Sequence, residues 1–217
     1  SKRYSGSLIE KSGNYDTVNR KMRWRIKINN VGPSDLNGYT VKDTLRYTGA
    51  TIVGGTDGIK VKYGSSGDNW DSINKMVSSK GTVMITKNEA GQETGFTYTF
   101  PAGSTEKYYL IEYYTTVPDD IQDNELLKND AEIDKDDKKQ DGTTGSGKVV
   151  RQGWAAVKSK VNRDLQNGAT DNQKIARWNA TAKSPESASS ITLCDRFFDP
   201  VNSSGQTLSE AEDTHYA

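Results

Sequence analysis

The sequence is poor in the two residue types on which many enzymes and metal sites depend. Its 217 residues include one cysteine, Cys194, and one histidine, His215. A single cysteine excludes an intramolecular disulfide, and a single histidine offers little from which to build a zinc cluster or a Ser/His/Asp triad. We therefore expect neither a metal or other cofactor nor a turnover enzyme.

The sequence also lacks a net charge and a long apolar segment. The 29 lysine and arginine residues balance 29 aspartate and glutamate residues, which argues against a surface for nucleic acid. No apolar run approaches the roughly 20 residues that cross a bilayer, and neither a signal peptide nor a sorting tail is recognisable. With 32% hydrophobic residues the chain suits one or two surface-rich domains, and its abrupt ends suggest a piece of a longer protein.

Helix signals are scarce, and alternating apolar and polar residues instead predict β-strands in the first two thirds of the chain. In MRWRIKIN (22–29) the apolar residues occupy one face and the basic residues the other. Only 68–77 and 119–128 could form short helical turns. Further strands are expected at 59–63, 83–87, 96–100, 108–117 and 129–133, separated by Gly, Ser, Asn and Asp. The pattern is typical of an all-β sandwich.

The run DKDDKKQDGTTGSG, which starts at Asp134, separates two units. Its charges followed by Gly, Thr and Ser predict a surface loop or linker, and the EF-hand spacing of a calcium site is missing. We expect a first unit at 1–146, with this linker at its C-terminal end, and a second at 147–217. In the second unit WAAVKSK, IARWNATA and SITLCDRFF repeat the order of a Lys-bearing strand, a Trp-bearing strand and a strand with an inward Asp. This order predicts an incomplete copy of the first unit.

Three polar side chains fall on the apolar faces of predicted strands in the first unit. Strand parity places Lys11 with the apolar residues of SLIEKSG, Asp43 with those of YTVKDTLR, and Asn129 with those of KNDAEI. A buried carboxylate normally protonates or finds a partner, so the other two groups are its candidate partners. Each residue alone also has a structural explanation: a bulge could shift the strand phase, the lysine could reach the rim, and the asparagine could bond backbone.

The motifs EKSG, MRWRIKINN, YTVKDTL, YLIEYYTTV and KNDAEI, in this order over roughly residues 7–133, resemble the isopeptide-forming domains of Gram-positive surface adhesins and pilins, of the collagen-adhesin A-type or fimbrial D2 kind. The resemblance implies an immunoglobulin-like β-sandwich in which the Lys11 amine and the Asn129 carboxamide fuse with Asp43 as the assisting acid. In the second unit it implies Asp195 as the acid and Lys158 as the amine. Lys160 is an alternative to Lys158 for the amine. No asparagine corresponding to Asn129 is found in the second unit before the last residue, Ala217.

The chemistry of such a bond follows from burial. Burial lowers the pKa of a lysine, which frees a lone pair, and raises the pKa of a carboxyl, which can then donate to the amide carbonyl. Folding supplies the proximity, so the protein is its own single-turnover substrate. Glu112 is a rival acid, because the strand YYLIEYYTTV can be read in two phases and one of them points Glu112 inward with Leu110 and Tyr114. Cys194 has an alternative interpretation as a thioester or nucleophile, against that of a small unpaired side chain.

The resemblance implies an extracellular module of a Gram-positive cell surface or cell wall, acting as an adhesin or as a stalk or pilin domain. A bond between the first and last strands would carry tension across the domain. The expected partners are a host extracellular-matrix protein or a glycan, together with neighbouring domains of a longer surface protein. The alternative is a carbohydrate-binding module of a secreted enzyme. An aromatic binding surface would come from Trp70, Tyr108, Tyr109, Tyr113 and Tyr114, although alternation assigns about half of such a run to the core.

Overall fold

The computed structural model describes residues 7–151, 155–160, 166–167, 174–175, 178–184 and 189–193. The chain divides into two compact units, Ser1–Gln152 and Gly153–Ala217, which are described separately. Among the described residues, no helix has the length and apolar character required to span a membrane.

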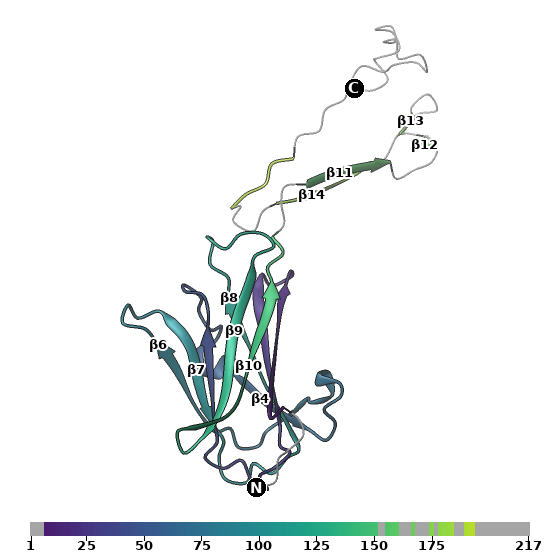
Figure 1. The fold of residues 1–217 in the computed structure, drawn as a ribbon. Coiled ribbons are helices and arrows are strands. Elements are labelled where there is room, and N and C mark those ends of the chain that lie inside the picture. Colours follow the sequence, from purple (N-terminus) through teal and green to yellow (C-terminus); the bar gives the residue numbers. More distant parts are fainter. Residues whose placement is uncertain are drawn as a thin grey trace. The chain divides into compact units, whose positions relative to one another are not determined.

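The first unit is an immunoglobulin-like β-sandwich of two antiparallel sheets, as expected (Figure 1). One sheet has the strand order β1-β2-β8-β4-β5 and the other β10-β9-β3-β7-β6. Its only helical elements among the described residues are a single α-turn, α1 (Gly55–Gly58), and a 3₁₀ turn at Trp70–Ser72. The strands are β1 (Ile9–Asp16), β2 (Lys21–Asn29), β3 (Thr40–Leu45), β4 (Lys60–Gly64), β5 (Lys75–Met76), β6 (Thr82–Lys87), β7 (Glu93–Thr99), β8 (Tyr108–Thr116), β9 (Leu126–Lys135) and β10 (Lys138–Lys148).

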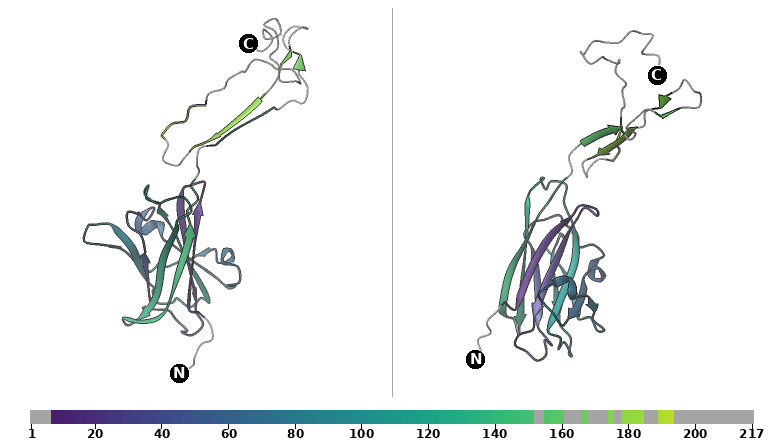
Figure 2. Two further views of the ribbon diagram at one scale, coloured as in Figure 1. Left: turned by 45° about the horizontal axis from the view of Figure 1, so that its top comes forward. Right: turned by 90° about the vertical axis from the view of Figure 1, so that its right-hand side faces the viewer.

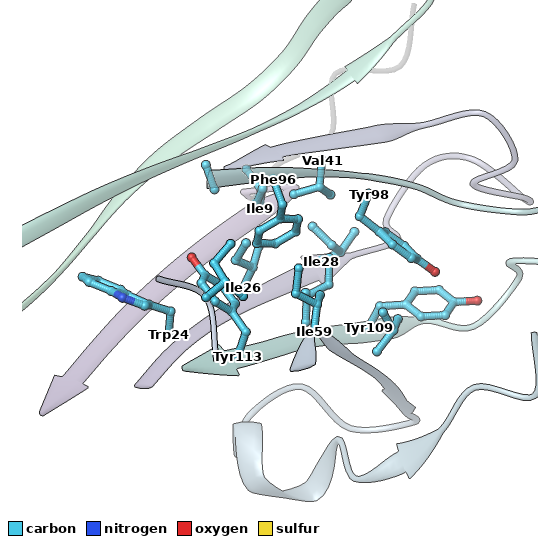
Figure 3. Packing of buried hydrophobic residues seen from close by; sticks show 14 of the residues in the cluster. Ile9, Trp24, Ile26, Ile28, Val41, Ile59, Phe96, Tyr98, Tyr109 and Tyr113 are labelled. Carbon is cyan, nitrogen blue, oxygen red and sulfur yellow. The ribbon is translucent and has the colours of Figure 1, made fainter. Parts of the chain in front are cut away.

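The core lies between the two sheets and follows the predicted alternation (Figure 3). The apolar residues of β2 are fully buried, which confirms the face predicted from MRWRIKIN. Across the sandwich Phe96 of β7 meets Tyr113 of β8 edge to face, with ring centroids 5.0 Å apart. Because fully burying one large apolar side chain contributes about 1.5–3 kcal/mol, this layer supplies most of the favourable free energy of folding.

The outer face of β2 is less exposed than its sequence predicts, because the segment around the 3₁₀ turn covers part of it. Lys27 is buried, and its Nζ donates to the Gly67 carbonyl at 3.1 Å. The same Nζ lies 5.2 Å from the centre of the Trp70 ring. Of the two segments expected to form helical turns, 68–77 contains this 3₁₀ turn, whereas 119–128 forms turns and the start of β9.

Residues 138–148 form strand β10, so the prediction of a loop or linker at this run is wrong. β10 pairs with β9, for example Thr143 with Ala131, and lies beside β1 (Figures 1 and 2). Asp141 Oδ2 accepts hydrogen bonds from the backbone N–H groups of Leu8 at 2.8 Å and Ile9 at 3.2 Å. Gly145 and Gly147, two of the residues that resemble a linker, carry no side chain where β1 passes close to them.

β1 and β10 run in the same direction. Successive residues of β10 lie beside successive residues of β1. Asp141 lies beside the start of β1, Gly145 against the Lys11 side chain, and Gly147 against the Gly13 backbone. A Cβ on Gly147 would approach the Gly13 carbonyl oxygen to 2.8 Å. The first and last strands of the sandwich are therefore parallel neighbours.

The described part of the second unit consists of two short antiparallel pairs, β11 (Ala155–Lys160) with β14 (Trp178–Lys183), and β12 (Gln166–Asn167) with β13 (Lys174–Ile175). Trp178 is 47% exposed and Ala180 is exposed. The apolar face expected on β14 is therefore not covered by another element in the part of the chain that the structure describes.

Candidate functional site

Lys11, Asp43 and Asn129 all point into the interior of the first unit. Asp43 on β3 and Asn129 on β9 belong to one sheet and are diagonal neighbours, because Leu45 pairs with Asn129 and Asp43 with Ala131. Lys11 on β1 belongs to the opposite sheet. The side chains of Lys11 and Asp43 have no exposed surface, and Asn129 is fully buried. The inward orientation predicted from strand parity is what the structure has for all three.

A single hydroxyl group links the three residues. Lys11 Nζ donates to Asp43 Oδ2 in a buried ion pair, and the Tyr113 hydroxyl donates to the same oxygen. Asn129 Nδ2 donates to the Tyr113 oxygen at 2.6 Å, and Lys11 Nζ lies 3.3 Å from that oxygen. Tyr113 therefore contacts every one of the three residues.

Burial dominates the protonation of this cluster. It lowers the pKa of Lys11, although Asp43 acts in the opposite direction, and it raises the pKa of Asp43, although Lys11, Tyr113 and Asn129 oppose it. Burial, reinforced by the nearby carboxyl, also raises the pKa of the Tyr113 hydroxyl well above its usual value. Burial thus shifts both members of the pair toward their neutral forms and keeps the phenol protonated.

Aromatic rings surround the amine. Lys11 Nζ lies 5.6 Å from the centre of the Trp24 ring and 5.6 Å from that of Tyr113. Trp24 is held in turn by a second polar chain, in which its indole N–H donates to Thr115 Oγ1 at 3.2 Å and that oxygen lies 2.9 Å from the Tyr47 hydroxyl. Burial raises the pKa of Tyr47 to about 12. These contacts fix the walls of a dry site.

Two oxygens of the cluster lack a hydrogen-bond partner, Asp43 Oδ1 and Asn129 Oδ1. An unsatisfied buried acceptor costs about 1–3 kcal/mol. A proton on the Asp43 carboxyl would convert one of these acceptors into a donor. The hydrogen bonding and the pKa directions therefore favour the same protonated acid.

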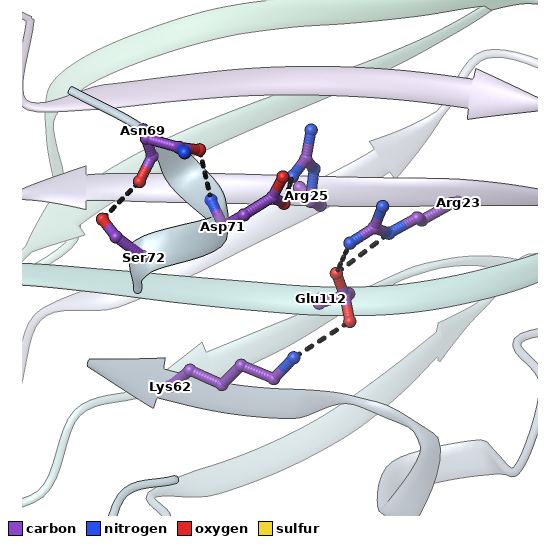
Figure 4. Close-up of polar contacts among 7 residues, drawn as sticks. All are labelled: Arg23, Arg25, Lys62, Asn69, Asp71, Ser72 and Glu112. Atoms are coloured by element: carbon purple, nitrogen blue, oxygen red, sulfur yellow. Dashed lines mark hydrogen bonds and ion pairs between the residues drawn. The ribbon is translucent and has the colours of Figure 1, made fainter. Parts of the chain in front are cut away.

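Glu112, the rival acid, faces the outer surface of its sheet, so the alternative that placed it inward is wrong (Figure 4). Its carboxylate accepts from Arg23 Nε at 3.0 Å and Nη2 at 2.5 Å, and from Lys62 Nζ at 3.1 Å. Burial raises the pKa of Glu112, but these hydrogen bonds outweigh burial and lower it overall. Glu112 is therefore a carboxylate that joins β2, β8 and β4.

About half of the aromatic residues predicted as a binding surface are in the core, as the alternation of side chains along a strand predicts. Tyr109 and Tyr113 are core residues, whereas Tyr108 and Tyr114 are half-buried. Trp70 lies on the outer face, 5.4 Å from the Arg25 guanidinium and 5.2 Å from Lys27 Nζ.

The candidates of the second unit are only partly described. Lys158 is exposed, and its Nζ lies 5.1 Å from the centre of the Trp178 ring. Lys160 pairs with Trp178 in the β11–β14 ladder. Asp195 and Cys194 lie outside the described residues, as does His215. A cross-link in this unit stays a prediction.

Residues 6–144 match the family model described as a collagen binding domain. The chain belongs to this family. The similarity to Gram-positive surface adhesin and pilin domains, expected from the sequence motifs, is thereby confirmed. The comparison with curated proteins gives no match.

Several solved structures resemble this member of the collagen binding domain family at low sequence identity. The collagen-binding domain from a Staphylococcus aureus adhesin is 16% identical with a TM-score of 0.44, covering 67% of this chain and 99% of its own. The collagen binding domain of the Erysipelothrix rhusiopathiae surface protein RspB is 20% identical with a TM-score of 0.47, covering 67% and 47%. BcpA, the major pilin subunit of Bacillus cereus, is 13% identical with a TM-score of 0.41, covering 94% and 67%.

Tyr113 is the site residue that sequence reasoning missed. The sequence assigned it to an aromatic run without a polar role. Its signal was the parity of β8, because Tyr109, Ile111, Tyr113 and Thr115 are the buried series and a buried phenol normally needs a hydrogen-bond partner.

Proposed function

We propose that this chain is an adhesive module of a bacterial cell surface whose first unit is closed by a spontaneous amide bond between Lys11 and Asn129, with Asp43 as the acid. The observation that carries the proposal is the convergence of these three side chains, from two opposite sheets, in an interior closed to solvent. The family match supports the adhesive, cell-surface role.

The reaction needs no group from outside the protein. A proton passes from the Lys11 ammonium to Asp43, and the neutral amine attacks Cγ of Asn129. The carboxyl donates to the carbonyl oxygen and stabilises the tetrahedral intermediate. A surplus proton of Lys11 Nζ reaches Nδ2 by way of the acid, the bond from Cγ to Nδ2 breaks and ammonia leaves, so one amide replaces another without oxidation or reduction. The pKa directions of Lys11 and Asp43 both support the neutral pair that this step requires.

The bond would join β1 of one sheet to β9 of the other, and not to the last strand as the sequence suggested, because β10 follows β9. By analogy with a disulfide that closes a loop of about 100 residues, it would stabilise the fold by on the order of 4 to 5 kcal/mol. Unlike a disulfide, an amide resists reductants. This fits a stalk or adhesin that carries mechanical load outside the cell.

We further infer that the partner is a host extracellular-matrix protein of the collagen kind, since the family is described by that ligand. The alternative of a carbohydrate-binding module gains no support from the described residues. Trp70 is half-buried, so part of its ring could contact a glycan. However, the Arg25 and Lys27 side chains already lie over this ring.

Intact-mass measurement of the purified chain tests the cross-link. The wild type is expected to be lighter than its sequence by one ammonia, and Asp43→Ala is expected to show the full mass. A folded wild type of full mass would refute the bond. Binding is tested separately on immobilised triple-helical collagen with heat-denatured collagen as the control, and equal retention on both would refute collagen recognition. Loss of a second ammonia would show that the second unit, for which no Asn counterpart was identified, also reacts through Asp195 and Lys158 or Lys160.

A further inference from the structure

We propose that Tyr113 is a fourth catalytic residue of the cross-linking reaction and that its hydroxyl delivers the proton with which ammonia leaves. The inference rests on the proposed bond between Lys11 and Asn129. It adds a role that neither the sequence motifs nor the family match assigns.

The geometry places the Tyr113 hydroxyl between the acid and the leaving nitrogen. The hydroxyl donates to Asp43 Oδ2, and its oxygen accepts from Asn129 Nδ2 at 2.6 Å. Asn129 Nδ2 is the atom that departs. Asp43 therefore has a hydrogen-bonded route to this atom through a single oxygen.

The hydrogen bond to Asn129 reverses when the amide becomes tetrahedral. A planar amide nitrogen can only donate, which is the arrangement in the unreacted structure. Once Lys11 Nζ has added to Cγ, Nδ2 is an amine with a free lone pair and can accept. The Tyr113 hydroxyl gives its proton to Nδ2 and takes one from Asp43, which had received it from Lys11 Nζ. The Asp43 carboxylate then accepts the remaining surplus proton of Nζ, so the new amide keeps one N–H and the acid ends protonated. Ammonia leaves, Tyr113 is a neutral phenol again, and no proton is gained or lost in the relay.

The position of the hydroxyl is fixed by the fold. Tyr113 of β8 pairs with Trp24 of β2 and packs edge to face on Phe96, with an interplanar angle of 83°. A ring packed against Phe96, with its hydroxyl bonded to Asp43 and Asn129, has few ways to move, which suits a group that must stay within hydrogen-bonding distance of two reacting side chains. Burial and the adjacent carboxyl raise the pKa of this phenol, so it remains protonated and relays a proton without acting as a base.

The test is a time course of ammonia loss after cell-free synthesis of the full chain, read by intact mass. Tyr113→Phe keeps the ring and removes the hydroxyl, and we expect bond formation to slow by about 100-fold, the lower end of the range for general acid–base catalysis. Tyr109→Phe is the matched control. Tyr109 is a buried residue of the same strand whose hydroxyl accepts from the Glu106 N–H, outside the site, so the wild-type rate is expected.

The outcomes separate this inference from the proposed function. A wild type that never loses ammonia refutes the cross-link itself. Wild-type and Tyr113→Phe chains that lose ammonia at the same rate refute the role of Tyr113 and leave the cross-link standing. Site-specific 3-fluorotyrosine at position 113 distinguishes proton transfer from positioning, since it keeps the hydrogen bonds but changes the acidity of the phenol. We expect its rate to differ from wild type by about threefold or more, and an unchanged rate overturns the relay.

A crystal structure of unreacted Asp43→Asn provides a test that does not depend on the folding of Tyr113→Phe. The Tyr113 oxygen is expected within about 3.2 Å of Asn129 Nδ2. A hydroxyl turned away from that nitrogen would overturn the proposal.

Discussion

The backbone of Gly145 lies directly against the side chain of Lys11. A Cβ placed on Gly145 would be 2.7 Å from Lys11 Cγ and 3.2 Å from its Cβ and Cδ. The contact is to the stem of a lysine whose two ends are held, one by β1 and the other by Asp43. The side chain therefore reaches the site through a space that only glycine leaves open.

Gly145→Ala is accordingly expected to displace the Lys11 stem, to slow ammonia loss and to lower the free energy of unfolding by about 1–3 kcal/mol through overpacking. The measurements are intact-mass time courses and denaturant unfolding. Gly142→Ala is the matched control on the same strand, because its Cβ would be crowded only by the far end of the exposed Lys139 side chain and would lie at an ordinary contact distance, 3.6 Å, from the Ala131 carbonyl oxygen. Equal reaction rates for the two variants would contradict the steric argument.

Replacing the acid should abolish the bond. Asp43→Asn keeps the shape of the side chain but cannot hold the proton that activates Asn129, so the chain is expected to retain its full mass. Its melting temperature should fall, because the cross-link contribution of on the order of 4 to 5 kcal/mol is lost. Asp71→Asn, at an exposed carboxylate that pairs with Arg25 on the surface, serves as the control and should lose ammonia normally. Loss of ammonia from Asp43→Asn would exclude the proposed acid.

Peptide mapping locates the bond. An acylated Lys11 is no longer a tryptic site, so digestion should yield a branched peptide that joins residues 4–20 to residues 129–135. Its mass should equal the sum of both peptides less one ammonia. Free peptides ending at Lys11 in the folded wild type would contradict the assignment.

The rate of bond formation should pass through a maximum with pH. The reactive pair holds one proton, shared between Lys11, whose pKa burial lowers, and Asp43, whose pKa burial raises. At lower pH a second proton restores the ammonium, and at higher pH loss of the last proton removes the acid. The check is a series of time courses across pH. A rate that only increases with pH would mean that amine deprotonation alone controls the reaction.

The outer charge cluster should stabilise the fold only above acidic pH. Hydrogen bonds from Arg23 and Lys62 outweigh burial and lower the pKa of Glu112 from 4.5, so the folded state binds fewer protons than the unfolded state. The stabilisation is complete above 4.5 and disappears as pH falls through the lowered pKa. Glu112→Gln should therefore cost on the order of 1 kcal/mol at neutral pH and little in strong acid.

Unfolding curves at both pH values measure the effect of Glu112→Gln. Glu89→Gln, in the exposed turn between β6 and β7, is the control. The same loss at both pH values would show that packing, and not ionisation, is responsible.

Strand parity was enough to predict much of the fold and the inward positions of the three residues proposed to react, because a two-residue period places side chains without knowledge of tertiary structure. Lys11, Asp43 and Asn129 were identified in this way, and Glu112 was ambiguous only because apolar residues occupy both phases of β8. Parity cannot describe what packs across the sandwich. One phase of β8 indicates a buried phenol at Tyr113, but its partners lie on β1, β3 and β9, and no pattern within β8 identifies them.

Composition was misleading where tertiary crowding selects small residues. The Gly-rich segment after Lys139 resembles a linker, yet it is a strand that must lie against β1. Lys27 shows the converse effect, since its outward position is correct but the segment at Gly67 and Trp70 covers it. Both errors arise from contacts between residues distant in sequence.

The parallel course of β1 and β10 has a mechanical consequence. Chain enters β1 at its first residue and leaves β10 at its last, so pulling the two ends of this unit slides the strands along each other lengthwise. All contacts along the pair must then yield together, in contrast to hairpin strands that peel apart one bond at a time. The arrangement resists rupture by geometry alone, before any covalent tie is counted.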